Sequence, residues 1–141
     1  MNQVMPSRRT FIGLLIAAPM LVSAIPARAA SRTMEVWKDP TCGCCKDWIS
    51  ILRKSGFEVT VNDTGNSAAR AKAGIARQYG SCHTALTGGY AIEGHVPVRE
   101  IERLLKERPD AVGLAVPGMV IGSPGMEQGG RVDPYTVLLL H

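Results

Sequence analysis

Four cysteines are the residues of this sequence best suited to chemistry. Three of them lie together in the segment Cys42-Gly43-Cys44-Cys45, and the fourth, Cys82, stands next to His83. Thiolates act as nucleophiles in thiol-disulfide exchange and as ligands for soft metal ions. The pattern therefore allows three kinds of site: a metal centre, a dithiol redox site, or a structural disulfide framework.

The spacing of the cysteines limits the disulfides that they can form. A bond between the neighbours Cys44 and Cys45 would be strained, and a bond between Cys42 and Cys44 would close an unusually small ring. A bond between Cys42 and Cys45, or a bond to Cys82, remains open. Cys42 and Cys45 have CxxC spacing at the start of a predicted helix, where free backbone N–H groups stabilise a thiolate. This position favours redox chemistry or metal binding over a purely structural bond.

The number of thiols favours a metal over a dithiol enzyme. Such an enzyme needs only a nucleophile and a resolving thiol, whereas this chain has Cys44 between them and Cys82 with His83 in a second segment. Four thiolates and an imidazole are a soft donor set, suited to Cu(I), Zn(II) or an iron-sulfur centre. A structural zinc site prefers separated cysteine pairs, whereas adjacent cysteines bridge several ions more readily than they chelate one. The sequence therefore favours a thiolate-bridged Cu(I) site.

Other side chains are weaker candidates for metal ligands. Met119 and Met126 carry thioether sulfur, a soft ligand for copper, on a segment rich in glycine and proline. Because methionine more often fills gaps in packing, both are secondary candidates. His95 precedes a predicted helix, and we expect it to cap that helix or to face solvent, with metal binding as the less favoured alternative.

Hydrophobic periodicity predicts the elements that position these residues. Residues 35–37 and 57–61 are expected to be strands, and the second of them alternates apolar and polar side chains. Between them, the apolar positions Cys45, Trp48 and Leu52 form one face of a helix. A right-handed crossover would make the two strands parallel and would place the cysteine segment at the carboxyl end of the sheet, where open α/β sheets bind ligands.

The rest of the chain completes an α/β domain. We predict a helix over residues 67–79, a hairpin of strands 84–87 and 90–92, and a helix that begins near residue 98 and ends before residue 109. A Gly/Pro-rich loop over residues 112–134 and a final strand over residues 137–140 follow. The order β-α-β, helix, β-hairpin, helix is that of a thioredoxin-like domain.

Residues 1–29 are typical of a cleaved signal peptide. Arg8 and Arg9 precede an apolar run over residues 11–25, which is too short to span a bilayer, and small residues follow it. The paired arginines favour twin-arginine export, so the mature domain would be residues 30–141 in the periplasm. Without residues 1–29, which hold three arginines and no acidic residue, the net charge falls from +4 to +1. We therefore expect no nucleic-acid partner and no stable membrane association after cleavage.

Four segments of the chain resemble the exported, thioredoxin-like metal-binding family called CopG-like, long catalogued as a domain of unknown function. Those segments are residues 39–45, 81–84, 89–97 and 122–127. The family is associated with periplasmic copper resistance, and its CxCC and CH motifs are taken to hold copper. The resemblance therefore implies copper binding by Cys42, Cys44, Cys45, Cys82 and His83.

Three functions follow from these observations. The first is a periplasmic copper-binding protein that sequesters Cu(I) or changes its oxidation state, with copper ions and other periplasmic copper proteins as partners. This function leaves open whether the chain is a copper-dependent oxidoreductase. The second is a thiol-disulfide oxidoreductase that uses Cys42 and Cys45. The third is a noncatalytic binding module, stabilised by zinc or by disulfides.

Overall fold

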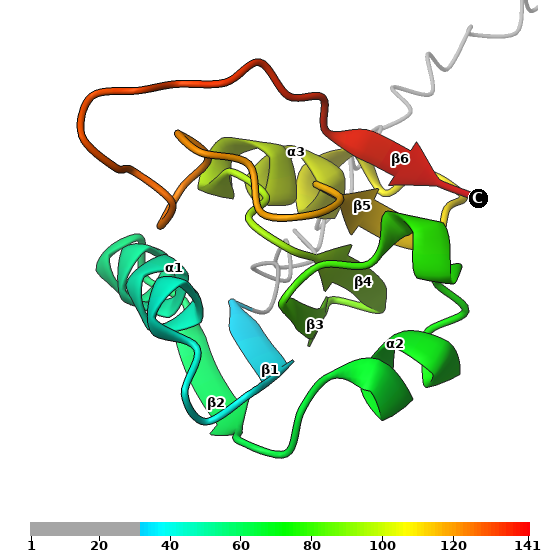
Figure 1. The fold of residues 1–141 in the computed structure, drawn as a ribbon. Helices are drawn as coiled ribbons and strands as arrows, with labels where there is room; N and C mark the ends of the chain where they lie inside the picture. Colours follow the sequence, from blue (N-terminus) through cyan, green and yellow to red (C-terminus); the bar gives the residue numbers. More distant parts are fainter. Residues whose placement is uncertain (1–31) are drawn as a thin grey trace, which may run out of the picture.

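The computed structural model describes residues 32–141, which form a six-stranded mixed sheet flanked by helices (Figure 1). The predicted signal segment, residues 1–29, lies outside the described residues. In chain order the elements are β1 (Thr33–Lys38), α1 (Gly43–Lys54), β2 (Glu58–Asn62), α2 (Ser67–Lys72), the 3-10 helix η1 (Arg77–Tyr79), β3 (His83–Thr87), β4 (Tyr90–Glu93), α3 (Val98–Glu107), β5 (Gly113–Ala115) and β6 (Leu138–Leu140).

The strands are ordered β2-β1-β3-β4-β5-β6 in the sheet. β1 and β2 are parallel and are joined through α1, as the sequence predicts. β3 pairs with β1 and with β4 in antiparallel fashion, which confirms the hairpin. β5 runs parallel to β4, and the final strand β6 is antiparallel to β5. The fold is thus mixed α/β, and the expected order of β-α-β, helix, hairpin and helix is present.

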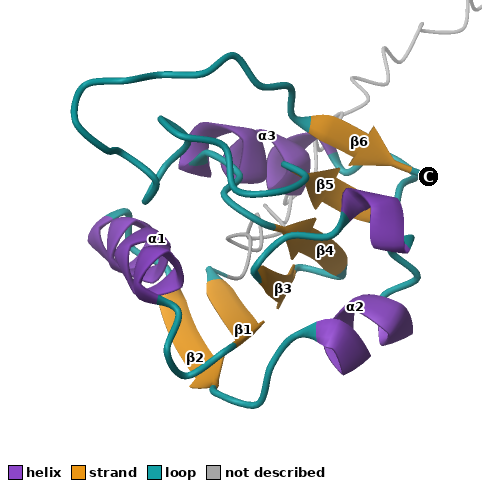
Figure 2. Cartoon of the chain, viewed as in Figure 1, coloured by secondary structure: helices purple, strands orange, loops and turns teal. Residues whose placement is uncertain are grey.

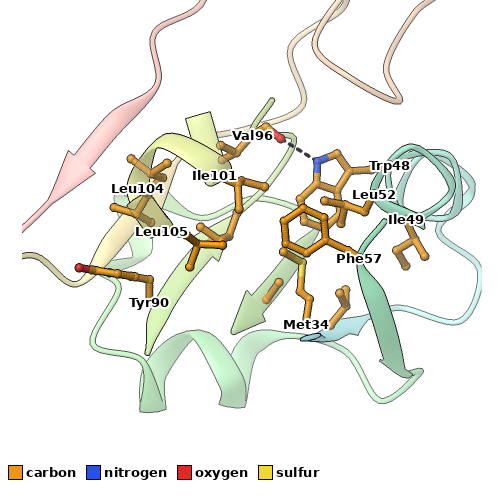
Figure 3. Packing of buried hydrophobic residues seen from close by; sticks show 14 of the residues in the cluster. Met34, Trp48, Ile49, Leu52, Phe57, Tyr90, Val96, Ile101, Leu104 and Leu105 are labelled. Carbon is orange, nitrogen blue, oxygen red and sulfur yellow. Dashed lines mark hydrogen bonds between the residues drawn. The ribbon is translucent and has the colours of Figure 1, made fainter. Parts of the chain in front are cut away.

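Helices cover both faces of the sheet (Figure 2). α1 and α3 lie on one face and enclose the larger hydrophobic core, in which Trp48, Leu52 and Ile101 are buried. Figure 3 shows this core and the hydrogen bond that the Trp48 indole donates to the Val96 carbonyl at 2.9 Å. The segment after α2, with Ile75 at its centre, packs on the opposite face. Alternating side chains of the central strands therefore face two different cores.

α1 forms where the apolar spacing predicts it. Cys45, Trp48, Ile49 and Leu52 are the buried residues of this helix and point into the sheet. At its start, the Cys42 sulfur accepts the backbone N–H of Cys45 at 3.3 Å, as an N-cap side chain does. The helix that carries the cysteine segment is therefore fixed by its buried face, and its first turn stays at the sheet edge.

Two predicted elements differ from the structure. The helix predicted over residues 67–79 ends at Lys72, because Gly74 has a φ of +75°, outside the helical region, and only the short η1 follows. The loop predicted over residues 112–134 contains β5. β5 has only three residues, too few to show a periodic pattern, and it forms because it is buried beside β4. In the part of the chain that the structure describes, no helix is long and apolar enough to cross a membrane.

Candidate metal centre

Three strand and helix ends meet at the cysteine cluster, which comprises Cys42, Cys44, Cys45 and Cys82. The first three cysteines belong to the turn between β1 and α1 and to the first turn of α1, while Cys82 immediately precedes β3. β1 and β3 are antiparallel, with Lys38 opposite His83, so the end of one strand meets the start of the other. The two cysteine segments are thereby brought together.

Each of the four sulfur atoms lies close to at least one other sulfur atom of the cluster. Cys42 and Cys45 form a disulfide, while Cys44 and Cys82 are free thiols. The Cys44 sulfur lies 3.5 Å from that of Cys42 and 3.9 Å from that of Cys82. The Cys82 sulfur is in turn 3.4 Å from the Cys45 sulfur. Reduction of the disulfide would release two more thiols and so bring four together at one place.

Two buried histidines adjoin Cys82. The Cys82 sulfur lies 3.3 Å from Nδ1 of His83 and 3.1 Å from Nε2 of His95. The His95 Nδ1 lies 2.8 Å from the Pro124 carbonyl, which can only accept a hydrogen bond, so Nδ1 carries the proton and Nε2 presents a lone pair to the sulfur. Nε2 of His83 is buried without a hydrogen-bond partner among the described residues. It is Nδ1 of His83 that faces the cluster, so this atom is the one placed to bind a metal there.

The position of His95 corrects the expectation from the sequence. His95 neither caps α3 nor faces solvent, because it is fully buried and its ring meets that of His83 edge to face at 4.8 Å. The hairpin register contains the signal that would have located it. Thr84 pairs with Glu93 around the Gly88-Gly89 turn, so continuing the register by two residues places position 82 opposite position 95.

Burial keeps these groups uncharged in the metal-free protein. Burial and the neighbouring Cys44 raise the pKa of the Cys82 thiol to about 12. Burial, with the nearby His95 and Lys38, lowers the pKa of His83 to about 3, and burial also lowers the pKa of His95. Neutral imidazoles can coordinate a metal without first losing a proton, whereas a thiol releases its proton when the metal binds.

The loop that follows β5 lies against this site. The Gly118 backbone N–H donates to the Gly80 carbonyl at 3.0 Å, and Pro124 holds His95 as described. Gly125 touches the first turns of α1, since a Cβ atom there would lie 2.7 Å from the Trp48 backbone nitrogen and 3.0 Å from the Cys44 carbonyl oxygen. The site is therefore bordered by a segment far away in the sequence.

The structure places the two candidate methionines differently. The Met119 side chain is 58% exposed on this loop, whereas Met126 is buried. Residues 122–126 form a closed turn in which the Met126 N–H donates to the Ser123 carbonyl. Metal binding by either thioether stays a prediction.

The donor atoms suit a soft metal ion. Within the described residues, one group of ligand atoms comes from the four cysteines and a second from Cys82, His83 and His95, and the atoms of each group lie within 4.8 Å of one another. Cys82 belongs to both groups. Thiolate sulfur and imidazole nitrogen are ligands for Cu(I) and Zn(II), and Cys82 links the two groups.

Comparison with known proteins finds solved structures of a copper resistance protein that are similar to this chain. A solved structure of copper resistance protein CopG, Form 1, is 48% identical, with a TM-score of 0.71 over 76% of this chain and 86% of that chain. Form 2 of the same protein is 49% identical, with a TM-score of 0.71 over 77% of this chain and 87% of that chain. A family model described as a protein of unknown function, DUF411, matches residues 79–126. Among curated proteins, none matches the chain.

Proposed function

Because the chain belongs to the CopG-like copper resistance family, we propose that it binds Cu(I) in the periplasm at its cysteine cluster. The observation that carries this proposal is the convergence of four sulfur atoms and two buried imidazoles at Cys82. Copper is the cargo or substrate of this site. Bound Cu(I) would be kept from harmful reactions by soft ligands that hold it more tightly than oxygen ligands do.

The arrangement of the cysteines supports Cu(I) over zinc. A structural zinc site uses four ligands arranged as a tetrahedron around one ion, commonly from two separated pairs. Here Cys44 and Cys45 are adjacent, and Cys82 lies within 3.9 Å of both of their sulfur atoms. Sulfur atoms crowded in this way suit bridging between two or more Cu(I) ions.

The disulfide supports a redox component of this function. Two Cu(II) ions could each accept one electron from the thiols of Cys42 and Cys45, giving two Cu(I) ions, the disulfide and two protons. The reaction balances without a further reagent, and an external reductant of the dithiol class would return the disulfide to two thiols. In this cycle the protein would handle copper and change its oxidation state at the same place.

The periplasmic location in this proposal rests on residues 1–29 alone. Their paired arginines and short apolar run are typical of export by the twin-arginine route. Exchange of this segment for an ordinary secretory signal, followed by measurement of copper content, would test whether folding before export matters. Equal copper content with both signals would count against loading before export.

An anaerobic titration tests the central claim. Reduced protein comprising residues 30–141 would be titrated with Cu(I) against a chromophoric chelator, with zinc in parallel. We expect uptake of more than one Cu(I) ion per chain, at lower free concentration than zinc, and a severe loss in Cys44→Ser. Weak binding of Cu(I), or an unchanged affinity and stoichiometry in Cys44→Ser, would contradict the proposal.

A thiol-disulfide oxidoreductase is the second candidate, because Cys42 and Cys45 are found as a disulfide at the N-terminus of a helix. In the reduced form, the Cys45 N–H that lies against the Cys42 sulfur would stabilise a thiolate there, as in enzymes of this kind. This function requires neither Cys44 nor Cys82. Reduction of insulin by metal-free protein, retained in Cys44→Ser, would support it, and the absence of turnover would remove it.

A further inference from the structure

A buried polar network lies behind Cys82 and contains no residue of the proposed copper site. Its centre is Glu93 at the end of β4, whose side chain is fully buried. The carboxylate accepts hydrogen bonds from Nε of Arg70 at 2.8 Å, from the backbone N–H of Ser81 at 2.7 Å and from the hydroxyl of Thr84 at 2.5 Å. All three partners donate, so the network suits an ionised carboxylate paired with a guanidinium.

The network holds Ser81, the residue before Cys82, from both sides. Its N–H bonds to Glu93, while its carbonyl accepts from Nη2 of Arg70 at 2.6 Å and from Nδ2 of Asn66 at 3.2 Å. The carbonyl belongs to the peptide that joins Ser81 to Cys82. Its orientation fixes the direction in which the chain passes through Cys82 into β3, and therefore where the Cys82 sulfur lies.

The residue that follows β4 lies against the remaining side of Ser81. Gly94, directly after Glu93, has a φ of +73°, and a Cβ atom there would lie 2.6 Å from the Ser81 Cβ and 2.5 Å from the Val116 carbonyl oxygen. The Ser81 hydroxyl bonds to the Gly118 carbonyl. Ser81 is thus enclosed by α2, β4 and the loop, and has little freedom to move.

Stability alone is a weak reason for such a network. Removing two charges from water costs free energy that their attraction often only balances, and apolar residues of similar volume can replace a buried ion pair without loss of stability. The pair between Arg70 and Glu93, with side chains 16% and 0% exposed, is of this kind. What apolar residues cannot supply is the set of directed hydrogen bonds to the N–H and the carbonyl of Ser81.

We propose that Glu93 and Arg70 are positioning residues, which hold Ser81 so that the Cys82 sulfur stays against the sulfurs of Cys44 and Cys45. The copper part of this inference rests on the proposed function. The geometric part does not, because it concerns how often the Cys82 and Cys45 sulfurs meet in the metal-free protein.

The geometric part is tested first, without metal. In a Cys42→Ser/Cys44→Ser background only Cys45 and Cys82 remain, and their disulfide is brought to equilibrium with reduced and oxidised glutathione. The equilibrium constant reports the effective concentration of one thiol at the other. We expect Glu93→Gln and Arg70→Lys each to lower it about tenfold, by analogy with the loss caused by removing outer partners of metal ligands.

A matched control separates positioning from folding. Tyr90→Phe, in the same strand as Glu93, removes the partly buried hydrogen bond from the Tyr90 hydroxyl to the Pro109 carbonyl at 2.8 Å. Tyr90→Phe should lower Tm without changing the thiol equilibrium. The double variant Arg70→Met/Glu93→Leu should restore much of the stability while the equilibrium stays impaired. A wild-type equilibrium constant in the folded Glu93→Gln and Arg70→Lys variants would overturn the proposal.

The copper part is tested on the chain with all four cysteines. Glu93→Gln should raise the Cu(I) dissociation constant about tenfold. If its Tm also falls, the Cu(I) dissociation constant of Tyr90→Phe shows how much of that rise a loss of stability alone would cause. If the original chain binds no Cu(I), the proposed function fails while the thiol equilibrium still decides the positioning role. If the chain binds Cu(I) and Glu93→Gln changes neither quantity, Glu93 is not a positioning residue.

Discussion

The sulfur of Cys82 lies 3.4 Å from the sulfur of Cys45, although the two residues are 37 positions apart in the chain. Cys45 is at the same time bonded to Cys42. The disulfide therefore occupies two sulfurs of the cluster and leaves Cys44 and Cys82 as the free thiols. Because a disulfide sulfur is a far poorer metal ligand than a thiolate, the oxidation state of this pair should control how much copper the protein accepts.

We accordingly predict that oxidised protein takes up fewer Cu(I) ions than reduced protein. Anaerobic titration of the two forms against the same chelator would measure the difference, and a reductant that does not bind copper should restore full uptake. Cys42→Ser/Cys82→Ser is the control and should respond less to oxidation, because it retains only the adjacent Cys44 and Cys45, whose disulfide would be strained. Equal stoichiometry in the oxidised and reduced forms of the original chain would show that Cys42 and Cys45 are not ligands.

A second prediction concerns His95, for which the sequence favoured a capping or solvent-exposed position over metal binding. Its Nε2 lies 3.1 Å from the Cys82 sulfur and its tautomer is fixed by the Pro124 carbonyl. We expect His95→Gln to weaken Cu(I) binding about tenfold or more, since loss of even an outer partner of a ligand costs that much. His141→Ala, at the exposed C-terminus, is the control. Competition titration would measure both, and an unchanged affinity in His95→Gln would show that His95 is not a ligand and would leave the thiols and His83 as the candidates.

His83 gives a third prediction, for the pH dependence of stability in the metal-free protein. Burial lowers its pKa to about 3, from 6.5 in the unfolded chain, and the nearby groups are His95 and Lys38. Between these pH values the unfolded state binds a proton that the folded state does not. Stability therefore falls as the pH drops from about 6.5 towards about 3, by up to about 1.4 kcal/mol per pH unit from this residue.

Urea unfolding at several pH values would measure this slope. His83→Gln removes the titrating group, so its stability should fall less steeply with decreasing pH. This holds even if the variant is less stable at pH 7, because the Trp48 ring loses its contact with the tilted imidazole ring at 4.2 Å between centroids. His141→Ala should keep the original slope. Parallel curves for the original chain and His83→Gln would contradict the burial of a neutral imidazole.

The four cysteines and His83 could be identified from sequence because their types and spacing are local. His95 could not, since a lone histidine before a helix is usually a cap or a surface residue. Its role depends on the register of the β3–β4 hairpin, which sets position 82 opposite position 95. The Gly88-Gly89 turn predicts that register. Pairing the two predicted strands residue by residue from this turn would therefore have placed His95 opposite Cys82.

The elements that the sequence missed are those fixed by tertiary contacts. β5 is a strand because Gly113 and its neighbours pair with β4, and a Cβ atom at Gly113 would collide with the Ala91 carbonyl oxygen. Likewise α2 has no buried residue, so no packed apolar face stabilises a continuation of the helix beyond Gly74. The Glu93 network could not be predicted from the sequence for a related reason, because Asn66, Arg70 and Glu93 come together only in the folded protein.

A fourth prediction tests whether the loop after β5 must contact α1 for the site to form. Gly125 and Gly129 both have positive φ, +83° and +57°, so alanine at either position costs about 1–2 kcal/mol from backbone strain. At Gly129 no atom lies within 4 Å of a new Cβ, whereas at Gly125 the Cβ would lie 2.7 Å from the backbone nitrogen of Trp48. Gly129→Ala is thus a matched control for the strain.

We expect Gly125→Ala to lose more stability than Gly129→Ala, because the loop must move away from the first turns of α1. That movement would also withdraw the Pro124 carbonyl from His95, which would free the imidazole to turn away from Cys82. Thermal unfolding of both variants and their Cu(I) dissociation constants would measure the two effects. If Gly125→Ala matches Gly129→Ala in Tm and in copper affinity, the loop does not support the site, because the contact with α1 would then contribute to neither folding nor binding.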